Sequence, residues 1–358
     1  MKTPLLAWRT LAVAAAVTAL VMGLRALDGL VEVDSSPASA AVEIDRGVLV
    51  DQPDPGDEDV TEEAAASDTT LSAGAVPATV QDLRLSGIAN LARHAERQAR
   101  LDLREQRVTQ RLLKTPFSLT YATFNILGSN HTAPGADADH FAPGRLRAEW
   151  AAQVASGWGM DIIGFSEIQS DQLDAFLSTT GGSYSVWPGS ALGGGGVPTS
   201  IVWKSDRFTL VDTDYVTIPF VGQQRPQPIV RLKETATGRE FFVFNAHNAP
   251  QDRQTERNIA IALEIEKIKE LRKTGLPVIF GGDLNEKSTA VCKVTSQTDL
   301  AAASPMGNYE GCSGWSGMRI DWIFGSPQID FSGYAQDRSA LVSRITDHAV
   351  IVAKATIN

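Results

Sequence analysis

The feature that most constrains the fold is a series of short apolar runs in residues 117–358, several of which are followed at once by a polar or acidic residue. The runs are Ser118–Ile126, Asp161–Phe165, Ser183–Trp187, Ser200–Lys204, Pro228–Leu232, Glu240–Asn245, Pro277–Phe280, Ile320–Phe324 and Ala349–Ala353. Their length and their aromatic and β-branched content predict β-strands. Continuous apolar runs are typical of strands that are covered on both faces.

Helical patterns lie between these runs. Leu146, Trp150 and Val154 share one face of a helix expected over Arg145–Trp158. A second helix, which should end at Gly275, is marked by Ile261, Ile265, Ile268 and Leu271. We therefore expect an α/β fold, a four-layer sandwich in which two packed mixed or antiparallel β-sheets are flanked by helices.

Residues 117–358 are the 242 residues that remain after the first 116, enough for one large core. They contain 20 Lys and Arg against 25 Asp and Glu, so this domain contributes −5 to the net charge of −10. No general basic field would attract nucleic acid to the domain, although bound cations can bridge carboxylates to phosphate.

The N-terminal 40 residues have the pattern of an export signal. Lys2 and Arg9 precede or border the apolar run Leu11–Leu24, and the small residues Ala38-Ser39-Ala40 close the segment. Because Ala40 lies far beyond the apolar run, an uncleaved membrane anchor is the alternative, with residues 1–30 as a possible membrane tether. Both interpretations predict a secreted or extracellular membrane-anchored protein.

Two further segments separate this N-terminus from the core domain. Residues 41–80 are rich in acidic residues and lack aromatic ones, which indicates a disordered linker. Residues 81–116 predict an Arg-rich amphipathic helix that ends before Pro116. This helix is either a basic arm for phosphate-rich ligands or a charged spacer with intrahelical ion pairs, and we favour the spacer because charge runs are usually solvated.

The chain has two cysteines, Cys292 and Cys312. In an exported protein, two cysteines this close in sequence predict a disulfide bond. A redox or metal pair is the alternative, but the C-x-x-C spacing is absent.

Polar and acidic residues accompany several of the predicted strands. They are Asn125, Glu167, His247, Asp283, Asn285, Asp321, Asp347 and His348. A single Asp after a strand is usually a turn former. Because many such residues occur at strand ends, we expect them to converge on one rim of the sheets.

Six short motifs carry these residues in the order TFN, GFSEIQ, NAHNAP, GGDLN, RIDWIF and TDHAV. In this order the chain resembles the endonuclease/exonuclease/phosphatase superfamily over essentially all of residues 117–358. The stretch from NAHNAP to GGDLN is most similar to the deoxyribonuclease branch. The resemblance implies a hydrolase of phosphoester bonds that depends on a divalent metal.

The resemblance also implies roles for the site residues. Asn125, Glu167 and Asp347 would hold Mg²⁺, or else Mn²⁺ or Ca²⁺, through oxygen ligands. Asp283 would hold or deprotonate the attacking water. Asn285, which we expect on the same side of an extended segment as Asp283, would steady that water or a phosphate oxygen.

Two histidines complete the implied catalytic set. His348 would donate to a phosphate oxygen or act in acid–base chemistry, and Asp321 would orient its imidazole and raise its basicity. His247 would assist the leaving group. Asn130, His131 and His140 are interpreted as surface residues of a polar loop.

Three positions depart from the family pattern. Leu127 stands where several members carry an acid, Gln169 where abasic-site enzymes carry a basic residue, and Thr346 where serine is usual. Abasic-site repair is therefore disfavoured. The expected function is hydrolysis of DNA or RNA by attack of water on phosphorus. The alternatives are a sphingomyelinase or phospholipase C-type diesterase, an inositol-phosphate-type phosphomonoesterase, and a catalytically silent surface module; no protein partner is evident.

Overall fold

The structure is a computed structural model that describes residues 79–304 and 320–358. Every described residue belongs to one unit of the chain, Pro77–Asn358. The predicted export signal or anchor, nearly all of the predicted acidic linker, and Cys312 lie outside the described residues. Within the two described ranges, no helix combines the length and the apolar character that a membrane span requires.

A 33-residue helix, α2, spans Val80–Leu112, where the spacing of apolar residues predicts a helix. Its large apolar side chains are exposed: Ile88 is 63% and Leu91 is 71% accessible to solvent. The helix ends four residues before Pro116, in agreement with the inability of proline to continue a helix.

Twelve strands in the described residues form two six-stranded sheets. The first sheet has the order β11 (Ile329–Asp337), β12 (Val350–Ile357), β1 (Phe117–Asn125), β2 (Ile162–Ser166), β4 (Ile201–Lys204) and β3 (Tyr184–Trp187). The second has the order β5 (Phe208–Phe220), β6 (Gln223–Glu234), β7 (Glu240–His247), β8 (Val278–Asp283), β10 (Asp321–Gly325) and β9 (Ala301–Ala302). β1 pairs with β2 and β7 with β8 in parallel, whereas the other pairings are antiparallel, so both sheets are mixed.

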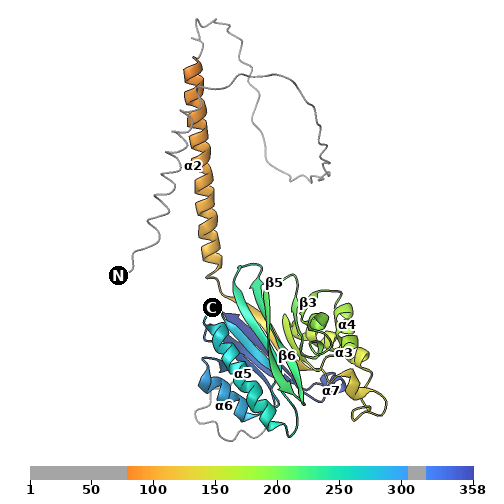
Figure 1. Cartoon of the computed structure of the whole chain (residues 1–358). Coiled ribbons are helices and arrows are strands. Elements are labelled where there is room, and N and C mark those ends of the chain that lie inside the picture. Colours follow the sequence, from red (N-terminus) through yellow and green to blue (C-terminus); the bar gives the residue numbers. More distant parts are fainter. Residues whose placement is uncertain (1–78, 305–319) are drawn as a thin grey trace. The chain divides into compact units, whose positions relative to one another are not determined.

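Helices cover the outer face of each sheet (Figure 1). The core over the first sheet includes residues of α3 (Gly144–Trp158), α4 (Ser170–Thr179) and α7 (Val342–Ile345). The core over the second includes residues of α5 (Gln254–Arg272) and α6 (Ser288–Gln297). The predicted four-layer α/β sandwich is therefore confirmed. In the described connections, 3₁₀ turns lie at Ser129–Thr132, Gly189–Leu192 and Val197–Thr199.

The two sheets pack through an apolar layer to which both contribute. Tyr121 of β1 and Ile351 of β12 belong to the same buried cluster as Val243 of β7 and Ile279 of β8. At one point the approach is so close that only glycine fits: a Cβ on Gly164 of β2 would lie 2.3 Å from Oδ1 of Asn245 in the opposite sheet. The apolar runs of the sequence are continuous because their strands are covered by helices on one side and by the other sheet on the other.

The strand prediction was incomplete at the sheet edges. β5, β9 and β11 were not predicted, nor were α4, α6 and α7. Most residues of β5 and β11 are exposed or half-buried, so neither strand carries the apolar run on which the prediction relied. The omission of β5 from the prediction matters for the site, because the end of β5 and the start of β6 form a hairpin beside the rim described next.

Candidate active site

The topology brings the polar strand ends to one rim. β1 ends in Asn125, and Glu167 follows directly after its parallel neighbour β2. β7 ends in His247 and its parallel neighbour β8 ends in Asp283, and these two residues are register partners. Asp321 begins β10 directly opposite Asp283. β12 runs antiparallel to β1, so His348, just before β12, lies at the same edge.

Asn125 lies at the centre of this rim and links the two sheets. Its amide nitrogen donates to Oε1 of Glu167 at 3.0 Å and to Oδ2 of Asp283 at 3.0 Å. Its oxygen accepts the backbone N–H of Leu127 at 3.0 Å, which fixes the orientation of the amide. In this arrangement the group of Asn125 that faces Glu167 is a donor, and its role as a metal ligand stays a prediction.

Asp283, Asp321 and His348 form a buried acid–base group. His348 Nδ1 lies 2.9 Å from Oδ2 of Asp321, so the predicted pairing of these two residues is present. Nε2 of the same ring lies 3.8 Å from Oδ2 of Asp283. The hydroxyl of Thr346 accepts the backbone N–H of His348 at 3.1 Å, as a serine at that position also could.

The electrostatics of this group follow from two buried carboxylates placed side by side. Burial raises the pKa of Asp283 to about 6, and the negative charge of Asp321 acts in the same direction. Burial disfavours the charged form of His348, but the hydrogen bond to Asp321 and the surrounding carboxylates outweigh it and raise the pKa of His348 to about 10. At neutral pH the ring is therefore an imidazolium that can donate from Nε2.

His247 approaches the same carboxylates from β7. Its Nε2 lies 3.9 Å from Oε1 of Glu167 and 3.7 Å from Oδ2 of Asp283, and its ring packs edge-on against Phe220. Burial lowers the pKa of His247, although the two carboxylates oppose this. Its Nδ1 is buried without a hydrogen-bond partner. His247, which is mostly neutral, therefore faces the cationic His348 across Asp283.

The backbone at the rim is constrained in three places. Leu127, Glu167 and Asn285 have φ values of 57°, 63° and 49°, in the left-handed region that side chains disfavour. Gly128 is required beside them, because a Cβ there would lie 2.9 Å from the backbone oxygen of Glu167. Its own N–H donates to Glu167 Oε2 at 3.3 Å. The turn after β1 and the turn after β2 therefore both help to fix the position of Glu167.

Asn285 is placed differently from our expectation, whereas the metal-ligand role of Asp347 stays a prediction. β8 ends at Asp283, so Asn285 is not part of an extended segment, and its amide donates to the backbone oxygen of Asn248 at 2.8 Å. Asp347 is exposed, and its one hydrogen bond among the described residues is the 3.5 Å contact with Thr346. Asn285 thus ties the turn after β8 to the turn after β7.

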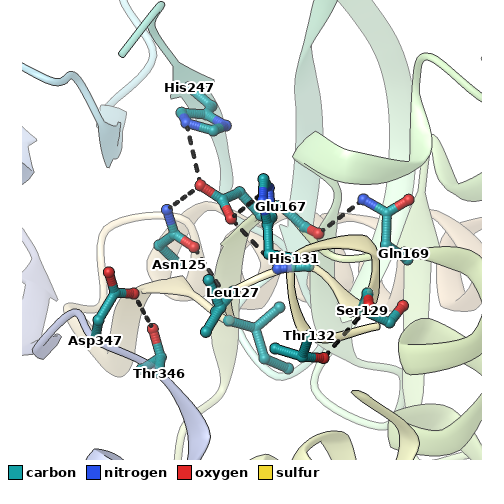
Figure 2. A network of polar contacts seen from close by, with 12 residues as sticks. Asn125, Leu127, Ser129, His131, Thr132, Glu167, Gln169, His247, Thr346 and Asp347 are labelled. Carbon is teal, nitrogen blue, oxygen red and sulfur yellow. Dashed lines mark hydrogen bonds and ion pairs between the residues drawn. The ribbon is translucent and has the colours of Figure 1, made fainter. Parts of the chain in front are cut away.

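A pocket of about 390 Å³ opens beside Glu167 and His247. It is lined by residues that sequence reasoning missed, among them His131, whose Nε2 lies 3.5 Å from Oε2 of Glu167 (Figure 2). The β5–β6 hairpin contributes Phe220 and Arg225, with the guanidinium carbon 3.6 Å from the ring centre. The hairpin turns at Val221 and Gly222, both with positive φ, and the glycine is the one residue of the pair that signals a tight turn, since valine disfavours this conformation.

The donor set fits a divalent cation. Glu167 offers a carboxylate to the pocket, and among the described residues the ligand atoms of Asp283, Asp321 and His348 lie within 4.8 Å of one another. Oδ1 of Asp321 is buried without a hydrogen-bond partner. Carboxylate oxygens are the ligands that Mg²⁺ and Ca²⁺ prefer. Because His348 and Asp321 already hold each other, Glu167, which faces the pocket, is a further candidate ligand.

Comparisons with known proteins agree with the fold described above. No curated protein matches the chain significantly. A solved endonuclease/exonuclease/phosphatase family protein from Bacteroides thetaiotaomicron is 22% identical, with a TM-score of 0.55 over 68% of this chain and 99% of that one. A mannosyl-6-phosphatase from the same species is 20% identical, with a TM-score of 0.51 over 67% and 100%. Zebrafish (D. rerio) TDP2 in complex with a single-stranded DNA product is 17% identical, with a TM-score of 0.52 over 66% and 98%.

These likenesses show the fold, which agrees with the two six-stranded sheets described above. The family itself is shown by a sequence model, because the model described as the endonuclease/exonuclease/phosphatase family matches residues 122–348. That range begins in β1 and ends at His348, so it includes every strand end of the rim. The chain belongs to the endonuclease/exonuclease/phosphatase family, and this membership supports phosphoester hydrolysis as its activity.

Proposed function

We propose that this protein is a divalent-metal-dependent nuclease that hydrolyses phosphodiester bonds of DNA or RNA. The observation that carries the proposal is that the acid–base group at Asp283 lies beside a pocket that is also lined by positively charged side chains. Arg225 and Arg253 line this pocket together with Glu167. A polynucleotide has phosphates on both sides of the scissile one, and these arginines could bind such a neighbouring phosphate.

The roles follow from the contacts. Asp283, held by Asn125 and close to both histidines, accepts the proton of the attacking water. His348, oriented by Asp321, donates to a phosphate oxygen. His247 assists the leaving group. A Mg²⁺, Mn²⁺ or Ca²⁺ ion at Glu167 would supply neutralisation of charge on the phosphate oxygens.

A second candidate is a phosphomonoesterase of a sugar or inositol phosphate. It is favoured by the neutral amides that line the same pocket: Asn130, Gln169, Gln223 and Gln251. Amides of this kind pair with the hydroxyl groups of a polyol. A sphingomyelinase or phospholipase C-type diesterase is a weaker candidate.

The location and the cysteine bridge belong to the same proposal. The N-terminal pattern in residues 1–40 supports export, with a secreted or surface-anchored product. Cys292 lies in α6, and its pairing with Cys312, which is outside the described residues, stays a prediction. A bridge between them would suit an oxidising compartment.

A substrate panel tests the proposal. Purified full-length protein is assayed with single-stranded and duplex DNA, RNA, sphingomyelin, inositol phosphates, mannose 6-phosphate and an aryl phosphate, with Mg²⁺ and with excess chelator. We expect polynucleotide cleavage that the chelator abolishes and that Glu167→Gln lowers by orders of magnitude. The matched control is Glu266→Gln, which removes an exposed carboxylate on α5. Cleavage of a sugar phosphate without cleavage of polynucleotide would establish the second candidate instead.

A further inference from the structure

Six arginines of α2 form a straight ladder along one face of the helix. They are Arg93, Arg97, Arg100, Arg104, Arg107 and Arg111. The steps between them alternate between four and three residues, and residues at these separations lie above one another on an α-helix. At ~1.5 Å per residue, the ladder extends over about 27 Å.

The ladder is exposed and electrostatically unpaired. All six side chains are exposed, and no ion pair links any of them to an acidic residue in the described residues. Glu96 stands three residues from Arg93 and four from Arg100, yet it pairs with neither. The side chain of Arg93 donates to Asn90. The structure therefore lacks the intrahelical ion pairs that the spacer interpretation of this helix expected.

We propose that the arginine ladder of α2 binds the phosphate backbone of the nucleic acid on which the protein acts. The catalytic domain, residues 117–358, carries a net charge of −5 and does not attract a polyanion. A row of guanidinium groups at this spacing can contact several successive phosphates without reading bases. The inference rests on the proposed function for its substrate class, and it names the surface that would hold the polymer.

A membrane surface is the less suitable partner for this helix. A helix that lies in a bilayer interface presents large apolar or aromatic side chains opposite its basic face. α2 contains no aromatic residue. The exposed apolar side chains of α2 are aliphatic, and Ala95, Ala99 and Asp102 occupy the middle of the side away from the arginines, so no continuous bulky apolar face stands opposite the ladder.

The test measures binding in chelator, so that hydrolysis is not needed for the signal. Full-length protein is titrated into a fluorescent 20-nucleotide single strand at several salt concentrations. The ladder variant replaces four arginines by glutamine: Arg97→Gln, Arg100→Gln, Arg104→Gln and Arg107→Gln. The matched control removes four exposed positive charges from the catalytic domain: Arg145→Gln, Lys273→Gln, Lys287→Gln and Lys354→Gln.

The expected salt dependence follows from counterion release. Six phosphate contacts to a single strand predict a slope of log affinity against log salt of about −4, or a loss of about 300-fold between 50 and 200 mM. The ladder variant, with two arginines left, should have a slope of about −1.4 and bind at least ~10-fold more weakly at 50 mM. The control should keep the parent slope.

Two further measurements keep the test decisive. Circular dichroism checks that the helix persists, since glutamine and arginine have similar helix propensity. Lysine at the same four positions should restore the slope. Equal affinity and slope in the ladder and control variants would overturn the proposal. It would also be overturned if, in a parallel titration of phosphatidylserine vesicles, the ladder variant lost its binding to the vesicles and kept its affinity for the single strand. Binding with the expected slope but without cleavage in Mg²⁺ would refute the proposed function alone, because the ladder would still be shown to bind nucleic acid.

Discussion

Glu264 on α5 offers a direct test of the electrostatics of the core. Its side chain is fully buried, and Nδ2 of Asn248 donates to Oε2 at 3.3 Å. Oε1 of Glu264 and Oδ1 of Asn248 have no hydrogen-bond partner, and no cation pairs with the carboxyl among the described residues. Burial raises the pKa of Glu264 to about 8, against the smaller opposing effect of the hydrogen bond from Asn248. The folded protein therefore keeps this carboxyl protonated at neutral pH.

The magnitude of the effect follows from linkage between protonation and folding. The unfolded chain releases the proton near the ordinary value of 4.5, whereas the folded chain releases it at about 8. The stabilisation associated with the bound proton is therefore complete below pH 4.5 and is lost progressively as pH rises to about 8. At 1.36 kcal/mol per pKa unit, the full loss is about 5 kcal/mol. Glu264→Gln keeps the shape and hydrogen-bonding capacity of the neutral acid and does not titrate, so it should remove this pH dependence.

The assay is urea denaturation of the wild type and the variant from pH 5 to pH 8.5. We expect unfolding free energies within about 1 kcal/mol of each other at pH 5 and a variant that is more stable by several kcal/mol at pH 8.5. Glu266→Gln, on the same helix but exposed and paired with Lys269 at 2.8 Å, should change stability by only a few tenths of a kcal/mol. Parallel pH profiles for the wild type and Glu264→Gln would refute the reasoning.

Four further predictions concern the site and its frame. His348→Ala and His247→Ala should each lower turnover by about 10²-fold or more while circular dichroism stays unchanged; near-normal rates at saturating substrate in both would remove their catalytic roles. Asp321→Asn should lower the pKa of the His348 ring from about 10, measured by NMR titration in chelator, because it removes the hydrogen bond and charge that raise it; an unchanged titration would contradict the pairing. Gly164→Ala should destabilise the fold by about 1–3 kcal/mol or more in chemical denaturation, since its Cβ would meet Asn245 at 2.3 Å; a neutral substitution would mean that the sheets can separate freely. Mass spectrometry of protein secreted under oxidising conditions should find Cys292 and Cys312 joined, with a bridge worth roughly 3 kcal/mol, whereas two alkylatable thiols would show that they are not.

The fold and the rim could be predicted because both depend on local patterns. Strands covered on two faces must be apolar throughout, so runs such as Asp161–Phe165 and Pro277–Phe280 are visible in the sequence. The polar residues directly beyond those runs stand where the strands emerge from the core. The parallel and antiparallel pairings then bring Asn125, Asp283 and His348 to one edge.

The rest could not be predicted because it depends on exposed strands and on turns. β5 faces solvent along most of its length and carries Asp212 and Asp214, so no apolar run marks it. Without β5, the placement of Phe220 and Arg225 beside His247 cannot be derived. The left-handed conformation of Asn285 is also invisible in the sequence, because asparagine is equally common in ordinary turns.

The electrostatic balance of the rim links the metal to the arginine ladder. Glu167, Asp283 and Asp321 place three carboxyl groups within one hydrogen-bonded cluster, and His348 is its one strongly cationic member. A phosphate that entered this rim without further positive charge would meet repulsion from the carboxylates and from a domain of net charge −5. A cation at Glu167 would relieve the local repulsion at the reacting phosphate, within a few ångströms. It would leave the domain with a net negative charge, so the repulsion of a polymer, which acts over about a Debye length, would be reduced but would persist. That second task requires positive charge outside the acidic domain, and the exposed face of α2 is where the described part of the chain carries it in an unpaired row.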